Sequence, residues 1–237
     1  IAGGDLQPKL DGVPIANWST FIARKGQVLS FGLPTNGLRA YLAVKGGFKA
    51  PVSLTSASTV VREKVGGPTQ DGQACQANQQ IHFEKHPISA DFKPLSVTFR
   101  YTPDYNLPLK LRVIEGYQSN LFSDDAKSTF YNTSFTVSQN SNRMGYRLSG
   151  EPVESPAITM LSEGIALGAI QIPKDGQPII LLNDRQTIGG YPKLGCVARI
   201  DLPRLAQAKP GQHVTFVEGD RSGLQDVWCQ WARFFGY

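Results

Sequence analysis

Cysteine is scarce in this sequence, with 3 residues among 237. Cys75, Cys196 and Cys229 lie far apart and form no Cys-x-x-Cys pair. This spacing excludes a zinc knuckle and a dithiol redox motif, so we expect three reduced thiols. Reduced thiols are typical of the cytoplasm, which is the compartment we predict.

Long apolar runs and clusters of like charge are also missing. No apolar segment approaches the roughly 20 residues that a membrane-spanning helix needs, so no membrane partner is expected. Charged residues make up 18% of the chain, and the net charge is +5. The basic residues are scattered among acidic ones without a run of five, which argues against nucleic acid as a partner.

Several catalytic signatures are absent. The sequence has no G-x-x-x-x-G-K-[ST] phosphate loop and no G-x-S-x-G nucleophile elbow. His82 and His86 lie four residues apart, but no third ligand is in view, so we predict no metal site. The two methionines, Met144 and Met160, flank no lysine, and we therefore expect no biotin attached to this chain.

Glycine and proline are frequent, with 24 and 16 residues, as expected for many short strands and turns. Apolar runs or alternating apolar and polar residues predict strands in eight places. These are residues 28–31, 38–44, 95–101, 109–114, 169–172, 179–182, 194–200 and 213–217. The Asp175-Gly176 pair tolerates a positive φ and predicts a tight hairpin. Residues 52–80 hold few large apolar side chains and are expected to form loops.

Helices are expected to be few. We predict a short helix over 120–131 and another from Asp201, the expected N-cap, to residue 207. A third would follow Ser222 as its N-cap. Its apolar stripe is more typical of a packing face than of a cofactor site. The stripe consists of Leu224, Val227, Trp228, Trp231 and Phe235.

Two polar segments, 138–147 and 183–193, are rich in functional groups. In the first, the guanidinium of Arg143 offers a planar fork for a carboxylate or phosphate. In the second, Asp184 could act as a general base and Lys193 could neutralise developing negative charge. The composition alone is equally consistent with two ordinary surface turns.

The order of three motifs resembles a known family. The motifs are residues 142–150 (Asn-Arg-Met-Gly-Tyr-Arg-Leu-Ser-Gly), 168–173 (Gly-Ala-Ile-Gln-Ile-Pro) and 183–192, which contains Asn-Asp, Gln-Thr and Gly-Gly-Tyr-Pro. Residues 38–48 resemble an earlier strand of the same family. The sequence is similar to the carboxyltransferase-like family that includes the C subunit of 5-oxoprolinase, the KipA protein and allophanate hydrolase subunit 2.

The resemblance implies a mainly β fold with a few short helices: a cyclophilin-like β-barrel plus a smaller β-rich subdomain. We expect residues 1–80 to form the rest of the N-terminal β subdomain and a crossing segment. Residues 81–219 would form the barrel subdomain and 220–237 a C-terminal amphipathic helix. Family members carry a further N-terminal segment with a Gln-Asp-x-Gly-Arg motif, which this sequence lacks. The chain alone is therefore expected to be inactive.

The resemblance also implies a function. The protein would be the C subunit of an ATP-dependent 5-oxoprolinase, which opens 5-oxo-L-proline to L-glutamate together with its A subunit and a KipI-like B subunit. ATP is then the expected cofactor, its site shared with the partner subunits. Two alternatives remain open: a carboxyltransferase unit acting on urea or a similar amide, and a non-catalytic KipA-type regulator of a kinase-inhibitor-like partner.

The predicted site takes a small anionic or amide substrate. Arg143, Asp184 and Lys193 are its expected catalytic residues, with Arg143 holding an anion and Asp184 polarising water or orienting an amide. Ten further residues are expected to bind substrate through side-chain or backbone groups. They are Asn142, Met144, Gly145, Asn183, Gln186, Thr187, Gly189, Gly190, Tyr191 and Pro192.

Overall fold

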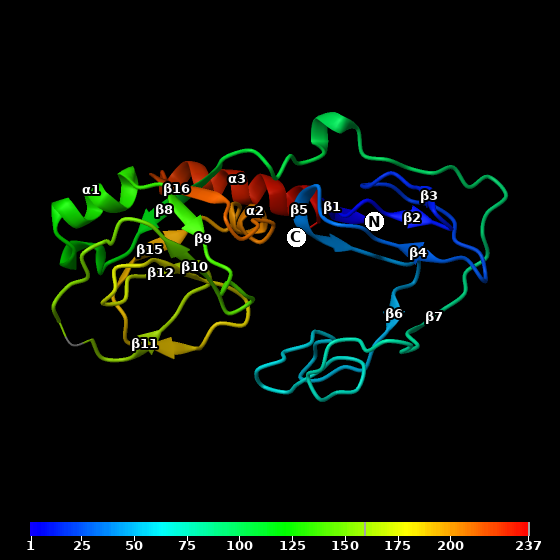
Figure 1. Ribbon diagram of the computed structural model, residues 1–237, viewed down its shortest axis with the longest axis horizontal. Helices are drawn as coiled ribbons and strands as arrows, with labels where there is room; N and C mark the ends of the chain where they lie inside the picture. Colours follow the sequence, from blue (N-terminus) through cyan, green and yellow to red (C-terminus); the bar gives the residue numbers. More distant parts are fainter. Residues whose placement is uncertain (159, 237) are drawn as a thin grey trace. The chain divides into compact units, whose positions relative to one another are not determined.

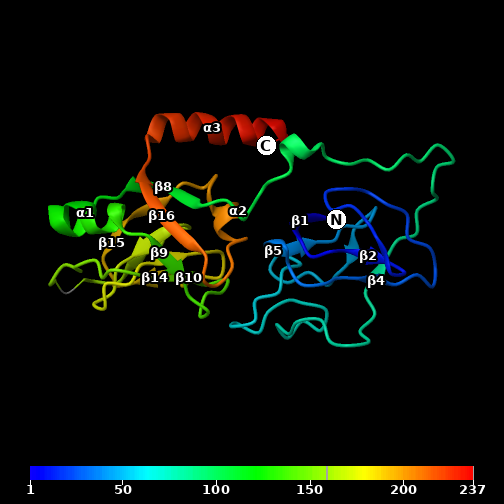
Figure 2. The ribbon, with the colours of Figure 1, turned by 45° about the horizontal axis from the view of Figure 1, so that its top comes forward.

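The computed structural model describes residues 1–158 and 160–236. The chain divides into two compact units (Figures 1 and 2). Unit 1 contains residues 1–3, 7–31 and 40–102, and unit 2 contains residues 4–6, 32–39 and 103–237. The domain boundaries expected from the sequence stay predictions.

A closed seven-stranded barrel forms the centre of unit 2. Its strands follow the order β10-β13-β12-β15-β8-β16-β9, and only β8 and β16 pair in parallel among the described pairs of the barrel. The strands are β8 (Leu109–Glu115), β9 (Phe135–Val137), β10 (Gly145–Ser149), β12 (Ala169–Gln171), β13 (Ile179–Leu181), β15 (Lys193–Val197) and β16 (His213–Glu218). The predicted β-barrel fold with few helices is confirmed.

Alternating side chains fill the barrel. Leu109, Leu111 and Val113 point inward from β8 and are buried, as a strand period of two requires. The ring of Phe130, on helix α1 (Asp124–Asn132), stacks on Phe216 with centroids 4.3 Å apart. Helix α1 thereby closes the core beside β16.

The predicted pairing of β12 with β13 is confirmed, but the connection is not tight: residues 172–178 join the two strands. Ile170 lies opposite Ile180 across the antiparallel pair. In the turn, Asp175 Oδ1 accepts a hydrogen bond from the Gln177 amide at 3.1 Å, and Gly176 has φ +71°. A Cβ at Gly176 would come within 2.8 Å of Val153 backbone atoms, so glycine is needed there for two reasons.

The helices begin differently from expectation. The 3₁₀ helix η2 (Ser119–Leu121) precedes α1, whose N-cap is Ser123. Helix α3 (Arg221–Phe234) is capped by Asp220, which accepts from the Gly223 amide, so the prediction of Ser222 as N-cap was wrong. Asp220 has the extended backbone that a cap requires, whereas Ser222 already lies inside the helix.

Helix α3 runs along the outside of unit 2 (Figure 2). Its apolar stripe is only partly covered: Leu224 is buried, whereas Trp231 and Phe235 stay 38% and 56% exposed. Trp228 stacks on Trp231 and carries the guanidinium of Arg199 over its ring at 4.3 Å.

Asp201 stands at the expected N-cap position of α2 (Leu202–Leu205), but its side chain makes no capping hydrogen bond. The carboxylate instead accepts from the backbone N and Nε of Arg112, both at 2.9 Å, and from Nη2 at 2.5 Å. The buried carboxylate therefore joins β8 to the segment after β15. Asp201 is thus the N-cap residue, as predicted, but its side chain binds this stronger charged partner instead of the helix amides.

Gln207 holds the start of β5 (Asn36–Tyr41) through three hydrogen bonds. Its Oε1 accepts from the amides of Leu38 and Arg39, and its Nε2 donates to the Arg39 carbonyl, all at 2.8–2.9 Å. The Arg39 guanidinium in turn donates to the hydroxyl of Tyr146 in β10 at 2.9 Å. The bond from Arg39 to Tyr146 thereby connects β5 to β10, the strand that carries part of the candidate site.

The expected strand over 95–101 is absent. Residues Phe99–Tyr101 form the 3₁₀ helix η1, and only Ser96 makes a bridge, to Ser19. Leu95 and Phe99 are 70% and 92% exposed, so the apolar side chains of this segment are not packed against a sheet. An alternating pattern yields a strand only where a neighbouring strand pairs with it.

Unit 1 contains short strands joined by long loops. One three-stranded sheet has the order β3-β2-β4, and β6 pairs with β7. The strands are β2 (Lys9–Leu10), β3 (Val13–Pro14), β4 (Leu29–Ser30), β6 (Phe48–Lys49) and β7 (His82–Phe83). Strand β1 (Ala2–Asp5) pairs with β5, and the division into units cuts both strands. Residues 52–80 form no helix or strand, which confirms the expected loops.

In the part of the chain that the structure describes, every helix is too short or too polar to cross a membrane.

Candidate functional site

One outer face of the barrel carries a row of four side chains. Arg147 of β10 lies opposite Ile179 of β13, which lies opposite Gln171 of β12, which lies opposite Lys193 of β15. Residues directly opposite in paired strands share a face of the sheet. The preceding residue in β10, Tyr146, is buried in the barrel core, so the row faces outward.

A β-bulge adjusts the last member of the row. The register of β12 against β15 shifts between Ile170 and Gln171, so Ile170 opposes Gly195 while Gln171 opposes Lys193. Leu194, the extra residue, is fully buried in the core. The bulge thus keeps the side chain of Leu194 inside the barrel and places the side chain of Lys193 on the outer face.

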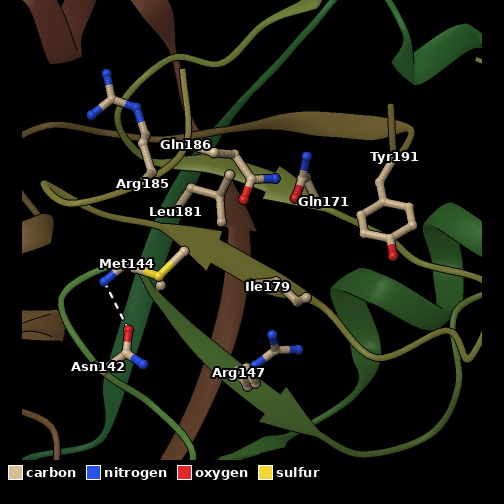
Figure 3. A pocket seen from close by; sticks show the side chains of 10 residues that line it. Asn142, Met144, Arg147, Gln171, Ile179, Leu181, Arg185, Gln186 and Tyr191 are labelled. Carbon is tan, nitrogen blue, oxygen red and sulfur yellow. Dashed lines mark hydrogen bonds between the residues drawn. The ribbon is translucent and has the colours of Figure 1, made fainter. Parts of the chain in front are cut away.

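A two-stranded ribbon crosses this face. It consists of β11 (Glu163–Gly164) and β14 (Ile188–Gly189), with Glu163 opposite Gly189. A Cβ built on Gly189 would lie 3.1 Å from Nε2 of Gln171 and 3.1 Å from Nε2 of Gln186. Both amide groups therefore approach this glycine. Figure 3 shows the side chains of Gln171 and Gln186 next to each other.

The two polar segments predicted from the sequence come together beside the ribbon. The Leu182 amide donates to the Met144 carbonyl, and the Asp184 amide donates to the Arg143 carbonyl, each at 2.9 Å. Asn142 Oδ1 accepts from the Met144 amide at 2.8 Å and shapes the turn before β10 (Figure 3).

A cavity of about 120 Å³ opens between these loops and the row. Most of its polar lining consists of amide and guanidinium groups, and none of the described residues around it is an aspartate or glutamate. The lining residues are Asn142, Met144, Gly145, Arg147, Gln171, Ile179, Leu181, Arg185, Gln186 and Tyr191. The arrangement favours a small ligand that has both an amide and a negative charge.

Gln171 is the most deeply buried polar group in the cavity wall. Its side chain is only 2% exposed, and its Nε2 has no hydrogen-bond partner among the residues described. An unsatisfied buried donor costs about 1–3 kcal/mol, so native structures rarely keep one without a purpose.

Arg185 contributes to the cavity differently from Arg147. Its Nε donates to the Ile165 carbonyl at 3.0 Å and its Nη1 to the Leu182 carbonyl at 3.2 Å. Arg185 therefore braces the ribbon, whereas no described carboxylate pairs with Arg147. The guanidinium of Arg147 is accordingly the group available for a ligand anion.

Arg143 and Asp184 bind one another and do not line the cavity, although their chain neighbours Met144 and Arg185 do. Arg143 Nε lies 2.9 Å from Asp184 Oδ2, and Nη2 lies 3.0 Å from Oδ1. This two-pronged pair engages both carboxylate oxygens. The anion-binding and general-base roles expected of the two residues stay predictions that require the pair to open.

Lys193 belongs to a polar network under the ribbon. Its Nζ lies 2.5 Å from Glu163 Oε1, and Glu163 also accepts hydrogen bonds from the Tyr117 hydroxyl and from Gln118 Nε2. The hydrogen bonds from Lys193 and then Tyr117 hold the pKa of Glu163 below its usual value, against a smaller opposing effect of burial. The same contact to Glu163 raises the pKa of Tyr117.

The remaining predicted residues line the loops and use mainly their backbones. The Thr187 carbonyl accepts from Ile165 and the Pro192 carbonyl accepts from Ile172, both at 3.0 Å. Gly190 follows the ribbon, and Asn183 is exposed. Five predicted residues do line the cavity: Asn142, Met144, Gly145, Gln186 and Tyr191.

Sequence reasoning chose only Lys193 from the outer row. Arg147 stood inside the first polar segment and Gln171 inside the motif 168–173, but neither was chosen as a site residue. The available signal for Gln171 was a single amide between Ile170 and Ile172 in a strand that is otherwise apolar. Arg185, in the second polar segment, was also not chosen, and Ile179 and Leu181 carried no signal in the sequence.

The described residues contain no group of three or more His, Cys, Asp or Glu side chains close enough to hold a metal ion. His82 and His86 are both exposed.

Comparison with known proteins identifies relatives along nearly the whole chain. A family model described as carboxyltransferase domain, subdomain A and B, matches residues 1–218. The chain is 33% identical to the 5-oxoprolinase C subunit of Haemophilus influenzae, over 91% of this chain and 67% of that protein. It is 31% identical to the 5-oxoprolinase C subunit of Escherichia coli, over 92% and 68% of the two chains.

A solved structure agrees with this result. The urea carboxylase of Kluyveromyces lactis superimposes with a TM-score of 0.84 at 26% identity, over 95% of this chain and 22% of that one. The chain thus spans about two thirds of the two curated relatives and less than a quarter of the urea carboxylase.

Proposed function

This chain belongs to the family of the carboxyltransferase domain, subdomains A and B, and on that premise we propose that it acts as the C subunit of an ATP-dependent 5-oxoprolinase. The complex would hydrolyse 5-oxo-L-proline to L-glutamate. Its partners would be the A subunit and a KipI-like B subunit of that enzyme, and its compartment the cytoplasm. The two curated 5-oxoprolinase relatives support the assignment.

The observation that carries this proposal is the chemistry of the cavity. 5-Oxo-L-proline combines a lactam, which has one N–H donor and one carbonyl acceptor, with a carboxylate. The cavity wall offers the amide groups of Gln171 and Gln186 beside the guanidinium of Arg147. Amide groups match a lactam, and guanidinium is the preferred partner of a carboxylate.

The residues in and near the cavity would have different roles in binding and hydrolysing the substrate. Arg147 would hold the substrate carboxylate, and the amide side chains would orient the lactam. Asp184, released from Arg143, would polarise the attacking water. Lys193 would stay on Glu163 and fix the ribbon that carries Gly189 over the ring.

ATP is expected outside this cavity. A volume of about 120 Å³ is below the roughly 300–1,000 Å³ of sites for larger ligands, so a nucleoside triphosphate does not fit. ATP would supply phosphoryl transfer to the lactam from a site held with the partner subunits.

The test is the formation of L-glutamate from 5-oxo-L-proline and ATP by the full-length protein assembled with the A and B subunits. We expect ATP-dependent glutamate formation that disappears when this chain is omitted. An assembled complex that binds ATP and forms no glutamate would contradict the proposal.

One observation favours a second candidate. The structural match to urea carboxylase supports a carboxyltransferase unit acting on urea or a similar amide. Co-purification of a biotin-carrying protein with the full-length chain, together with urea-dependent consumption of carboxybiotin, would favour this function over the first.

A further inference from the structure

The amide of Gln171 lies buried in the wall of the cavity, and its Nε2 has no partner among the described residues. We propose that Gln171 is the specificity-determining residue that donates a hydrogen bond from Nε2 to the carbonyl oxygen of an amide substrate. The inference deepens the proposed function and rests on it for the identity of the ligand.

The position of Gln171 is fixed by its strand. It ends β12 with pairing partners on both sides, Ile179 in β13 and Lys193 in β15. Its side chain is 2% exposed and lines the cavity, so the amide has little freedom to turn toward solvent. A donor held in this way is preorganised for a ligand and has little side-chain entropy left to lose on binding.

None of the described groups next to Gln171 accepts a hydrogen bond from its Nε2. Lys193, on the same face, forms an ion pair with Glu163 at 2.5 Å, and its ammonium group has only donors, so it cannot accept a hydrogen bond from Gln171 Nε2. Gly189 above it lacks the Cβ that would stand 3.1 Å from Nε2. Among the residues that the structure describes, none accepts the Nε2 hydrogen bond. The space next to Nε2 therefore suits an acceptor atom that arrives with a ligand.

A carbonyl oxygen is the acceptor that fits best. A carboxylate would be drawn to Arg147, two strands away in the same row. A ligand with a carboxylate and an amide carbonyl would then satisfy both groups at once. A ligand that lacks the carbonyl would leave Gln171 unpaired, and sites built for a hydrogen bond reject such analogues strongly.

L-Proline is the matched probe, because it has the five-membered ring and the carboxylate of 5-oxo-L-proline but no ring carbonyl. The experiment measures dissociation constants of both compounds by calorimetry, using the assembled full-length complex without ATP. We expect the wild type to prefer 5-oxo-L-proline. Gln171→Leu should reduce this preference by about tenfold or more, through weaker 5-oxo-L-proline binding. An unchanged preference would overturn the inference.

Two further variants separate a binding effect from a folding effect. Gln171→Met has nearly the same length without a donor and should lose the preference as Gln171→Leu does. Gln225→Leu makes the same change on the exposed face of α3 and should keep it. Retention of the preference in Gln171→Met with native thermal unfolding would also overturn the inference.

The outcomes distinguish this inference from the proposed function. If the complex forms glutamate but its preference for 5-oxo-L-proline over L-proline does not depend on Gln171, the inference is overturned and the proposed function is retained. If 5-oxo-L-proline neither binds nor reacts, urea serves as the second probe. Urea binding that requires Gln171 would support the inference against the 5-oxoprolinase assignment, whereas Gln171-independent binding or no binding would overturn it.

Discussion

Arg143 and Asp184 hold each other through two contacts, Nε to Oδ2 at 2.9 Å and Nη2 to Oδ1 at 3.0 Å. They come from the two polar segments of the sequence, 41 residues apart. The Asp184 side chain is 12% exposed, whereas the Arg143 side chain is 56% exposed. The pair joins the two loops that carry the cavity residues Met144 and Arg185.

A charge swap tests whether this pair is only structural. Arg143→Ala and Asp184→Asn should each lower glutamate formation by the complex by about tenfold or more, because each removes a group expected to meet substrate or water. The double variant Arg143→Asp with Asp184→Arg should restore pairing and assembly, as measured by size-exclusion chromatography, but not activity. Recovery of near wild-type turnover by the swap would show a purely structural pair.

Glu163 should make the ribbon sensitive to acid. Its pKa is lowered in the folded protein, chiefly by Lys193, so its stabilising contribution is present above the unfolded pKa of about 4.3. That contribution is lost as the pH falls through the lower folded value. Melting temperatures of wild type and Glu163→Gln should therefore differ at neutral pH and converge in acid. Glu151→Gln changes an exposed residue and is the control, for which we expect no pH-dependent change in the melting-temperature difference from wild type. A melting-temperature difference between wild type and Glu163→Gln that persists in acid would contradict the account.

Gly189 should be intolerant of a methyl group. In Gly189→Ala the new Cβ would stand 2.8 Å from Ile165 Cδ1 and 3.1 Å from both amide nitrogens at the cavity. We expect KM for 5-oxo-L-proline to rise about tenfold, since the amides must move. Gly164→Ala changes the same ribbon where nothing lies within 4 Å of the new Cβ, and it should leave KM unchanged. Equal effects of the two variants would show that the cavity is not the substrate site.

The buried carboxylate of Asp201 should matter for stability. It accepts three hydrogen bonds from Arg112, and its side chain is 8% exposed. Asp201→Asn keeps the shape but loses the charge, which should cost about 2–3 kcal/mol in the free energy of unfolding by urea. Asp226→Asn on exposed α3 is the control and should cost less than about 0.5 kcal/mol. A similar loss for both variants would contradict the assigned role.

The fold could be predicted where local signals decide it. The Asp175-Gly176 pair between two apolar runs predicted the antiparallel pairing of β12 with β13, although the connecting loop over residues 172–178 is longer than a tight turn. The strand expected at 95–101 failed for the opposite reason. Its alternation was present, but Phe99 and its neighbours found no sheet to pair with.

The site could be predicted only in part. The family motifs led to the loops with Asn142 and Gln186, which do line the cavity. Gln171 and Arg147 lay inside the motifs but were not chosen as site residues, because a polar residue in a strand ordinarily faces solvent. Only the register across four strands, with the bulge at Leu194, shows that they share one outer face of the barrel.

The central claim is that the cavity binds the substrate, and the KM of an Arg147→Ala complex tests it most directly. Arg147 lines the cavity and would carry the substrate carboxylate. The account predicts a KM for 5-oxo-L-proline at least about tenfold above wild type, with native assembly. Lys174→Ala in the exposed hairpin turn should leave KM unchanged. A wild-type KM in Arg147→Ala would contradict the account.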